Sequence, residues 1–248
     1  MPTIPSLLEM LQAGVHFGHQ KSKWHPKMKS YVFGERQGIH IIDLEKTQKQ
    51  LDKACAFAKQ ISSRGGQILF VGTKKQATDY VAKAAESCGM PYVNKRWLGG
   101  TLTNYVNMAH LLRKYKDLKR KLEKGELGKY TKFEQQKFSE QVANYDEKIG
   151  GLINMTRIPD AVFILDIRKD KTALQEATRR GVKVIAVCDT NVNPTNVMYP
   201  IPANDDAVKA IEMIANTVAG AIKEGRDDWE KNRARLGGAL VQSGKKGR

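Results

Sequence analysis

The sequence has only three cysteines in 248 residues and no long apolar segment. Cys55, Cys88 and Cys188 are widely separated, and each lies among apolar residues. This pattern predicts buried free thiols and excludes a disulfide framework or a zinc knuckle. The longest apolar runs, such as ILFV and AVFIL, are far shorter than the roughly 20 residues that a membrane-spanning helix needs. The N-terminus also lacks the basic segment and cleavage site of a secretory signal. We therefore expect a cytoplasmic protein with no membrane partner.

The motifs of common enzyme classes are absent as well. No G-x-G-x-x-G follows a predicted strand, and the sequence has neither a G-x-x-x-x-G-K-[ST] loop nor a G-x-S-x-G elbow. His40 and His110 are isolated, so we interpret both as structural or solvated side chains. We expect no enzyme, no catalytic residues, no required cofactor and no small-molecule substrate.

Acidic residues are scarce relative to basic ones. The 42 lysines and arginines exceed the 26 aspartates and glutamates by enough to give a formal net charge of +16. A charge of this size is typical of nucleic-acid-binding proteins. A membrane surface also attracts basic chains, but the short apolar runs argue against it. The composition therefore predicts a polyanionic partner.

Short apolar runs alternate with amphipathic helices along most of the chain. The runs with strand character are QILFVG, PYVN, DAVFILD and KVIAVCD, and the last helix of the series is AVKAIEMIANTVAGAIKEG. Unbroken apolar strands between such helices predict a parallel sheet covered on both faces, that is, a doubly wound α/β domain. Before this series, SYVF and IHIID flank GERQG and predict a short β-hairpin.

One insertion, residues 105–150, interrupts this rhythm. Two helices there each carry a narrow apolar seam, formed by Met108, Leu111, Tyr115, Leu118 and Leu122 and then by Phe138, Val142, Tyr145, Ile149 and Leu152. A seam of two positions in seven predicts an antiparallel coiled-coil hairpin that protrudes roughly 30 Å from the body. We therefore divide the chain into an α/β domain (1–104 and 151–226), the hairpin (105–150) and a basic C-terminal tail (227–248).

Basic side chains are concentrated in four segments, and two of these segments also contain tryptophan. A run of charge usually marks a solvated face, but four such clusters together favour an extended surface that neutralises phosphates. Trp24 and Trp97 either stack on bases or anchor their loops, and both alternatives stay open. The tail contributes Arg233, Arg235, Lys245, Lys246 and Arg248. The binding candidates are Lys21, Lys23, Trp24, Lys27, Lys29, Arg36, Lys95, Arg96, Trp97, Arg113, Lys114, Lys116, Lys119 and Arg120.

The turn FVGTKKQ at residues 70–76 has three interpretations. Gly72 leads from a strand into a helix whose start bears Lys74 and Lys75, so it forms a tight turn, a phosphate site for a small molecule, or a contact with a nucleic-acid phosphate. We prefer the tight turn to the small-molecule site. Lys74 and Lys75 join the binding candidates through the nucleic-acid interpretation. An α/β enzyme that binds a phosphorylated substrate at the Gly72 turn is our alternative function.

Three aspartates are candidate ligands for a divalent ion. Asp189 follows a predicted strand, and Asp205 and Asp206 precede the final helix, so their oxygens could gather at the carboxyl edge of the sheet. Asn204 as a helix cap with acidic neighbours explains the same residues, and we prefer that interpretation.

The stretch HFGHQKSKWHP at residues 16–26 contains three histidines. It has neither a cysteine partner nor an H-E-x-x-H pattern, so it does not predict a metal site. We interpret it as a loop that lies against RNA or a protein neighbour.

Several longer segments resemble one known family. HFGHQKSKWHPKMKSYVFGERQGIHIIDLEKT, ILFVGTKKQA, NKRWLGGTLTN, INMTRIPDAVFILD and VCDTNVNPTNVMYPIPANDDA are similar, in order and spacing, to segments of bacterial small-subunit ribosomal protein number two. The similarity extends from Leu7 to about Trp229. The final stretch, GGALVQSGKKGR, departs from it, and nothing is carried over for those residues.

The resemblance implies a flavodoxin-like domain with an inserted helical hairpin, located on the ribosome at the junction of the small-subunit head and body. It further implies binding of 16S rRNA, contact with other small-subunit proteins and docking of the mRNA-capturing ribosomal protein number one. It implies no enzymatic activity. From it we expect a structural constituent of the small ribosomal subunit that supports translation, with the hairpin reaching RNA beyond the globular body.

Overall fold

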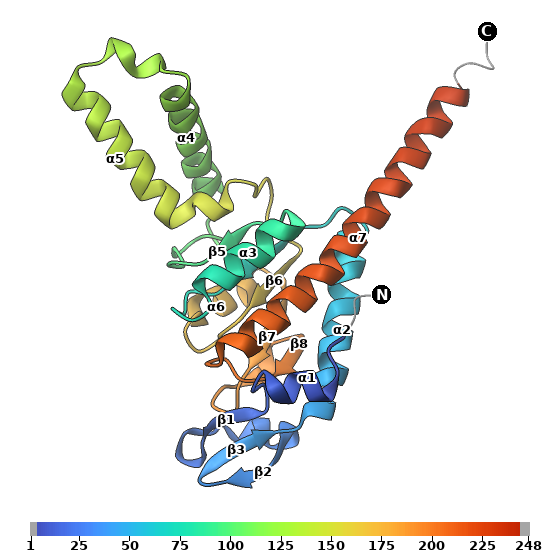
Figure 1. Cartoon of the computed structure of the whole chain (residues 1–248). Coiled ribbons are helices and arrows are strands. Elements are labelled where there is room, and N and C mark those ends of the chain that lie inside the picture. The colour runs from blue at the N-terminus through green and yellow to red at the C-terminus, as the bar shows by residue number, and fades with distance from the viewer. Residues whose placement is uncertain (1–3, 244–248) are drawn as a thin grey trace.

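The computed structural model describes residues 4–243, apart from the side chains of Lys129 and of residues 235–243. A five-stranded parallel sheet forms its centre, with helices on both faces (Figure 1). Across the sheet the strands are β5 (Tyr92–Val93), β4 (Ile68–Val71), β6 (Ala161–Ile164), β7 (Lys183–Cys188) and β8 (Tyr199–Pro202). Numbered along the chain this order is 2-1-3-4-5, the order of flavodoxin-like folds. The predicted doubly wound sheet is confirmed.

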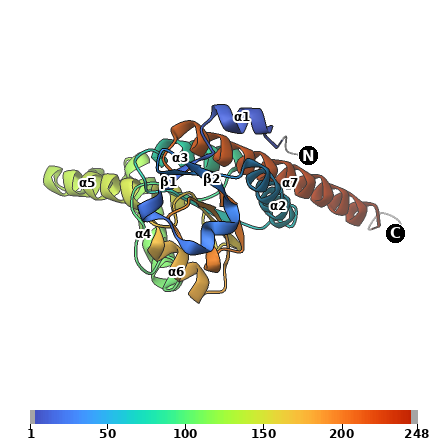
Figure 2. The same ribbon diagram turned by 90° about the horizontal axis from the view of Figure 1, so that it is seen from below.

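The two faces of the sheet carry separate apolar clusters. Ile68 and Phe70 of β4 point into one cluster, whereas Leu69 and Val71 point into the other, because side chains alternate along a strand. The first cluster is covered by α2 (Leu44–Ser62), α3 (Thr78–Cys88) and α7 (Val208–Ser243), and α2 and α7 lie side by side (Figures 1 and 2). The second is covered by α6 (Lys171–Arg179) and by residues at the base of the helical insertion.

The edge strand β8 has no counterpart among the predicted strands. Its sequence, YPIP, contains Pro200 and Pro202, and proline is a poor sign of a strand because it cannot donate a backbone hydrogen bond. At an edge, one side of the strand needs no partner, and among the described strands β8 pairs only with β7. Proline is therefore tolerated at this position.

A small antiparallel sheet precedes the parallel one. The predicted β-hairpin forms as β2 (Val32–Arg36) and β3 (Ile39–Ile42), but β3 also pairs with β1 (Phe17–Gln20). The expectation of a loop was thus wrong for Phe17–Gln20. The strand passes close to the β7 loop at Gly18, where a Cβ atom would lie 2.6 Å from Cγ2 of Thr190. Helix α1 (Leu7–Gln12) precedes β1, and the short helices η1 (Lys21–Lys23) and η2 (Pro26–Tyr31) follow it.

The insertion folds into two helices, α4 (Tyr105–Glu123) and α5 (Lys132–Ile149), joined through η3 (Glu126–Lys129) and followed by η4 (Gly150–Leu152). They project from the body in Figure 1. The predicted seam is buried near the body at Met108, Tyr115 and Ile149, but Leu122 near the tip is 37% exposed. Leu112 is buried where we expected Leu111. The buried residues belong to the same cluster as the second face of the sheet, so the base of the hairpin is part of the body's core.

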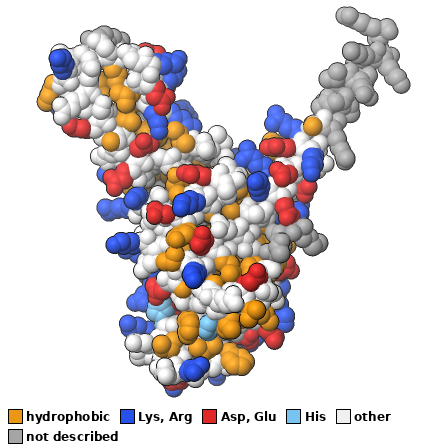
Figure 3. Space-filling view, in the orientation of Figure 1, with side chains coloured by type: hydrophobic (Ala, Val, Ile, Leu, Met, Phe, Trp, Pro, Cys, Tyr) orange, Lys and Arg blue, Asp and Glu red, His pale blue; other side chains and the backbone are white. Residues whose placement is uncertain are grey.

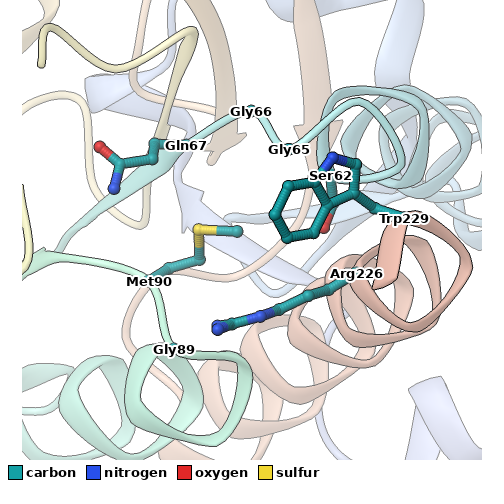
Figure 4. A pocket seen from close by; sticks show the side chains of 8 residues that line it. All are labelled: Ser62, Gly65, Gly66, Gln67, Gly89, Met90, Arg226 and Trp229. Atoms are coloured by element: carbon teal, nitrogen blue, oxygen red, sulfur yellow. The ribbon is translucent and has the colours of Figure 1, made fainter. Parts of the chain in front are cut away.

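Helix α7 extends beyond the sheet, and two of its side chains are directed toward turns of the body. Figure 4 shows Arg226 and Trp229 pointing from α7 toward the turns at Gly89 and Gly65. Arg226 donates a hydrogen bond of 3.1 Å to the carbonyl oxygen of Cys88. Residues 227–243, which we assigned to a tail, continue α7, and residues 244–248 with Lys245, Lys246 and Arg248 lie outside the described residues, as does the side chain of Arg235. Among the described helices, none is long and apolar enough to cross a membrane.

The shared core leads to a prediction about hairpin truncation. Deleting residues 106–149 removes five buried side chains from the second cluster (Met108, Leu112, Tyr115, Val142 and Ile149). Each contributes about 1.5–3 kcal/mol, and the total is comparable to the free energy of unfolding of a whole domain, about 5–15 kcal/mol. We therefore expect this deletion to abolish cooperative thermal unfolding.

A shorter deletion provides the matched control. Replacing residues 120–139 by a short Gly-Ser linker keeps all five buried side chains, so the body should retain a cooperative transition. A cooperative transition after the larger deletion would show that the seam seals internally and that the body does not need it.

Candidate nucleic-acid interface

The N-terminal candidates lie on the surface of the small sheet and its two short helices. Lys21 pairs with Glu35 at 2.8 Å, and Lys27 donates a hydrogen bond of 2.7 Å to Oγ1 of Thr195. The side chains of Lys23, Lys29 and Arg36 are exposed and make no hydrogen bond or ion pair with the described residues. Free cations in this segment are therefore available to an external anion.

The hairpin candidates divide in a similar way. Arg113, Lys114 and Lys116 are exposed on α4 and make no ion pair with the described residues. Lys119 is half-buried and contacts Asp146 at 3.1 Å, and Arg120 lies 3.5 Å from Asp117. Figure 3 shows Lys and Arg side chains on the hairpin and along the left edge of the body below it.

The loop before the hairpin is organised by one buried carboxylate, that of Glu176 on α6. Its oxygens accept hydrogen bonds from Nε1 of Trp97 (3.0 Å) and from the backbone N–H groups of Gly100 (2.8 Å), Leu102 and Thr103 (3.0 Å each). Burial opposes ionisation of Glu176, but these donors outweigh it and hold its pKa below the ordinary value. Arg180, which caps the C-terminal end of α6, donates to the carbonyl oxygens of Leu102 and Thr103.

The two tryptophans therefore differ in their surroundings. Trp97 is 9% exposed and hydrogen-bonded to Glu176, which favours the anchoring alternative over base stacking. Its neighbours Lys95 and Arg96 are exposed and unpaired within the described chain. Trp24 is half-buried, and its ring centroid lies 5.3 Å from that of His40. One face of Trp24 is thus in contact with the small sheet.

The Gly72 turn is already filled by groups of the protein itself. A Cβ atom at Gly72 would lie 2.5 Å from Cγ2 of Val81, so the turn packs tightly against α3. The backbone N–H and the hydroxyl of Thr73 both donate to the buried carboxylate of Asp170. An internal anion therefore takes the position that we considered for a phosphate, which supports the tight-turn interpretation. Lys75 remains exposed to solvent.

Lys74 is directed inward, toward three carboxylates. Its Nζ lies 2.7 Å from Asp206, 2.8 Å from Asp205 and 3.5 Å from Asp166, and its side chain is only 18% exposed. Burial opposes the charge of Lys74, but hydrogen bonds to Asp205 and Asp206 hold its pKa above the ordinary value. These acids follow β6 and β8, so the lysine neutralises the crevice at the switch point between β4 and β6.

The same cluster contains the imidazole of His19. Its Nδ1 lies 3.0 Å from Asp189 and its Nε2 lies 3.5 Å from Asp206. The hydrogen bond to Asp189 raises the pKa of His19. Burial, together with repulsion from Asp166 and Asp189, raises the pKa of Asp205 to about 6.

The donor set of this cluster does not fit a divalent ion. One ligand atom each from His19, Asp205 and Asp206 lies within 4.8 Å of the others, as a metal site would require. However, the ammonium of Lys74 already lies between Asp205 and Asp206. Asp189 is engaged by His19 and by the N–H and hydroxyl of Thr190. The preferred capping interpretation has direct support, because Oδ1 of Asn204 accepts from the N–H groups of Asp206 and Ala207.

Sequence reasoning missed Asp166, Asp170 and Glu176. Asp166 ends DAVFILD in the same way that Asp189 ends KVIAVCD, so the rule that we applied to one strand would have found it. Glu176 lies on the apolar face of its helix, three residues after Ala173 and beside Ala177, both of which are fully buried. A carboxylate on a buried helix face requires hydrogen-bond donors from other segments, so the position of Glu176 among buried alanines could have marked it as a structural site.

The chain is similar to proteins of one known family. Residues 10–225 match the family described as ribosomal protein S2. The small ribosomal subunit protein uS2 of Dehalococcoides mccartyi is 47% identical over 227 residues, which are 92% of each chain. The protein of the same name from Coprothermobacter proteolyticus is 45% identical (90% of this chain and 84% of the relative). The uS2 of Bdellovibrio bacteriovorus is 44% identical (91% and 72%).

The network around Glu176 generates a prediction about stability. In Glu176→Gln, the amide NH₂ replaces one acceptor and is directed at backbone N–H groups, so buried donors lose their partner. We expect a loss of about 2–3 kcal/mol in the free energy of unfolding, measured by urea denaturation at neutral pH. Glu212→Gln, at an exposed position of α7, is the matched control and should change the stability by less than about 0.5 kcal/mol. Equal effects of the two substitutions would contradict the anchoring role.

The ion pair of His19 generates a prediction about pH. Because the folded-state pKa of His19 is raised, its stabilising effect is complete below the unfolded value of about 6.5 and is lost as pH rises through the folded value. His19→Gln should therefore lower the unfolding temperature more at about pH 6 than at about pH 9. Asp205 titrates in both proteins, so the difference between them reports on His19. A larger effect at the higher pH would contradict the pair, and His110→Gln, on the exposed side of α4, serves as the control.

Proposed function

The chain belongs to the ribosomal protein S2 family, and on that premise we propose that it is a structural constituent of the small ribosomal subunit that binds 16S rRNA. The family is one of structural ribosomal proteins and not of enzymes, in agreement with the absence of enzyme motifs from the sequence. Binding is electrostatic: exposed lysines and arginines neutralise phosphates and position the protein on folded RNA. The chain works on the ribosome in the cytoplasm and supports translation.

The observation that carries the proposal is a set of cations on three separate elements, each lacking a carboxylate partner among the described residues. They are Lys23, Lys29, Arg36, Lys95, Arg96, Arg113, Lys114 and Lys116. A solvated surface that only has to keep a protein soluble mixes charges of both signs. One extended polyanion can contact all of these unpaired cations, which lie on the N-terminal segment, the 94–101 loop and the hairpin.

We propose that the hairpin extends the RNA-binding surface beyond the globular body. Its base is fixed in the core of the body, whereas α4 presents cations further out, so residues 105–150 reach RNA that the sheet cannot touch. We propose coiled-coil packing of α4 and α5 near the body, supported by the contact of the Tyr115 and Tyr145 rings at 6.0 Å. The α/β domain (1–104 and 151–226) and the C-terminal segment (227–248) complete the division that we propose.

A different surface suits protein neighbours. Leu8, Phe17 and Phe33 of α1, β1 and β2 are 63%, 49% and 79% exposed. Hydrophobic side chains gather over these elements at the bottom of Figure 3. Exposed apolar patches usually mark protein contacts. We propose that other small-subunit proteins bind here, including the mRNA-capturing ribosomal protein number one that the family resemblance implies.

The alternative of an enzyme at the Gly72 turn is not favoured. Lys74 is engaged by three carboxylates and Thr73 by Asp170, so a phosphorylated substrate would have to displace both internal partners. The proposed function requires no cofactor, and the ammonium of Lys74 replaces a divalent ion in the acidic cluster.

The test is the salt dependence of binding to purified 16S rRNA. Neutralising Arg113, Lys114 and Lys116 together to glutamine should weaken binding and reduce the slope of log K against log salt by about 3, one for each phosphate contact. The control carries the same change of charge on α2 and α7: Lys49→Gln, Lys209→Gln and Lys223→Gln, all at exposed positions. Identical slopes for the two triple variants would show that the effect depends on net charge and not on the hairpin.

A further inference from the structure

A groove at the carboxyl edge of the sheet lies beside the filled crevice. It is bounded by η1, the loop after β6, the start of α6 and the loop after β7, and it encloses about 470 Å³. Ligand pockets in proteins range from about 300 to 1,000 Å³. In doubly wound folds the ligand lies outside the carboxyl ends of the strands, which is where this groove opens.

The charge of the groove is of one sign. Lys23, Arg168 and Lys171 line it, and no aspartate or glutamate is among its lining residues. All three side chains are exposed, and none makes a hydrogen bond or an ion pair within the part of the chain that the structure describes. Three unpaired cations around one cavity attract a phosphate, and arginine can hold it in a bidentate manner.

Three asparagines also line the groove, together with Gln175 of α6. Asn191, Asn193 and Asn196 lie within eight residues after the end of β7. Oδ1 of Asn193 accepts from Thr195, which orients that amide, whereas Oδ1 of Asn191 is buried without a donor among the described residues. An amide carries a donor and an acceptor side by side, as does the edge of a nucleic-acid base. A partner with both groups would satisfy Asn191.

Three apolar residues, Ile167, Leu174 and Val192, also line the groove. Ile167 and Val192 are 4% and 5% exposed, and they offer a hydrophobic surface to the flat face of a base. The backbone N–H of His25 donates to the carbonyl oxygen of Thr190 at 2.8 Å, and that of His19 donates to its Oγ1 at 2.9 Å. These bonds hold the N-terminal segment against the β7 loop, so Lys23 lines the same groove as Arg168 and Lys171.

We propose that this groove binds a single unstacked nucleotide of the ribosomal RNA. The phosphate lies at Arg168, Lys171 and Lys23, the base edge lies at the asparagines, and the base face lies on Ile167 and Val192. Proteins read single-stranded RNA in this way, through unstacked bases that are packed on side chains and hydrogen-bonded at their edges. The inference rests on the proposed function, and it adds a site for one defined nucleotide to a surface that otherwise contacts phosphates.

The experiment uses small subunits reconstituted with the full-length chain. Four proteins are compared: the unaltered chain, Arg168→Gln with Lys171→Gln, Asn191→Ala, and a control with Lys209→Gln and Lys223→Gln on α7. Each assembly is sedimented, and the reactivity of its rRNA is probed by 2′-hydroxyl acylation. Ultraviolet irradiation of the same assembly then crosslinks bases to the peptides that contact them.

We expect all four proteins to sediment with the subunit, because the other cations remain. In the two groove variants, one nucleotide or two adjacent nucleotides should become several-fold more reactive toward acylation. In the assembly with the unaltered chain, ultraviolet light should crosslink the same nucleotide to residues 167–175 or 190–196. The control should leave the reactivity unchanged.

Two results would overturn the inference and leave the proposed function intact: groove variants whose acylation pattern equals that of the unaltered chain, or groove peptides joined only to a neighbouring protein. If the unaltered chain fails to sediment with the subunit, the proposed function itself is lost.

Discussion

A buried carboxylate, which has no cation at hydrogen-bonding distance among the described residues, fixes the geometry on which the candidate interface depends. Glu176 lies on α6, and its oxygens are satisfied by Trp97 and by three backbone N–H groups of the loop that leads into α4. A buried charge is costly unless each oxygen has donors, and the observed conformation of the loop supplies those donors to Glu176. That conformation sets where the hairpin leaves the body. The base of the hairpin then packs into the second apolar cluster, so its direction is determined by both the carboxylate and the core.

The crevice at the switch point of the sheet is filled by side chains of the protein itself. In this architecture the crevice beyond the strands usually receives the phosphate of a ligand. Here Asp170 takes the place of the anion at the Thr73 turn, and Lys74 neutralises Asp166, Asp205 and Asp206. The crevice thereby becomes part of the scaffold, and it ties the loops after β4, β6 and β8 to one another. The exposed lysines and arginines on the outer surface are therefore available to an external partner.

Most of the architecture could be predicted from hydrophobic patterns, because four of the five parallel strands are apolar runs and their helices have clear faces. The exceptions have physical causes. The prolines of β8 argue against a strand unless it lies at the edge of a sheet, and its edge position cannot be read from the sequence. The short sequence of β1 has no apolar pattern, and its position depends on the close approach of Gly18 to Thr190. The site was harder to predict. Lys74 and Lys75 are adjacent in sequence, yet one is held by carboxylates and the other is exposed, and only the tertiary positions of Asp205 and Asp206 separate them.

The central claim is that this chain is a structural part of the small ribosomal subunit. Sedimentation of a tagged chain from bacterial lysate through a sucrose gradient tests it most directly, with the magnesium concentration lowered in a second gradient to separate the subunits. The account predicts that the chain sediments with the small subunit in both gradients and leaves it only as salt is raised, because phosphate contacts weaken with salt. A chain that remains at the top of the gradient at physiological salt and magnesium would contradict the account.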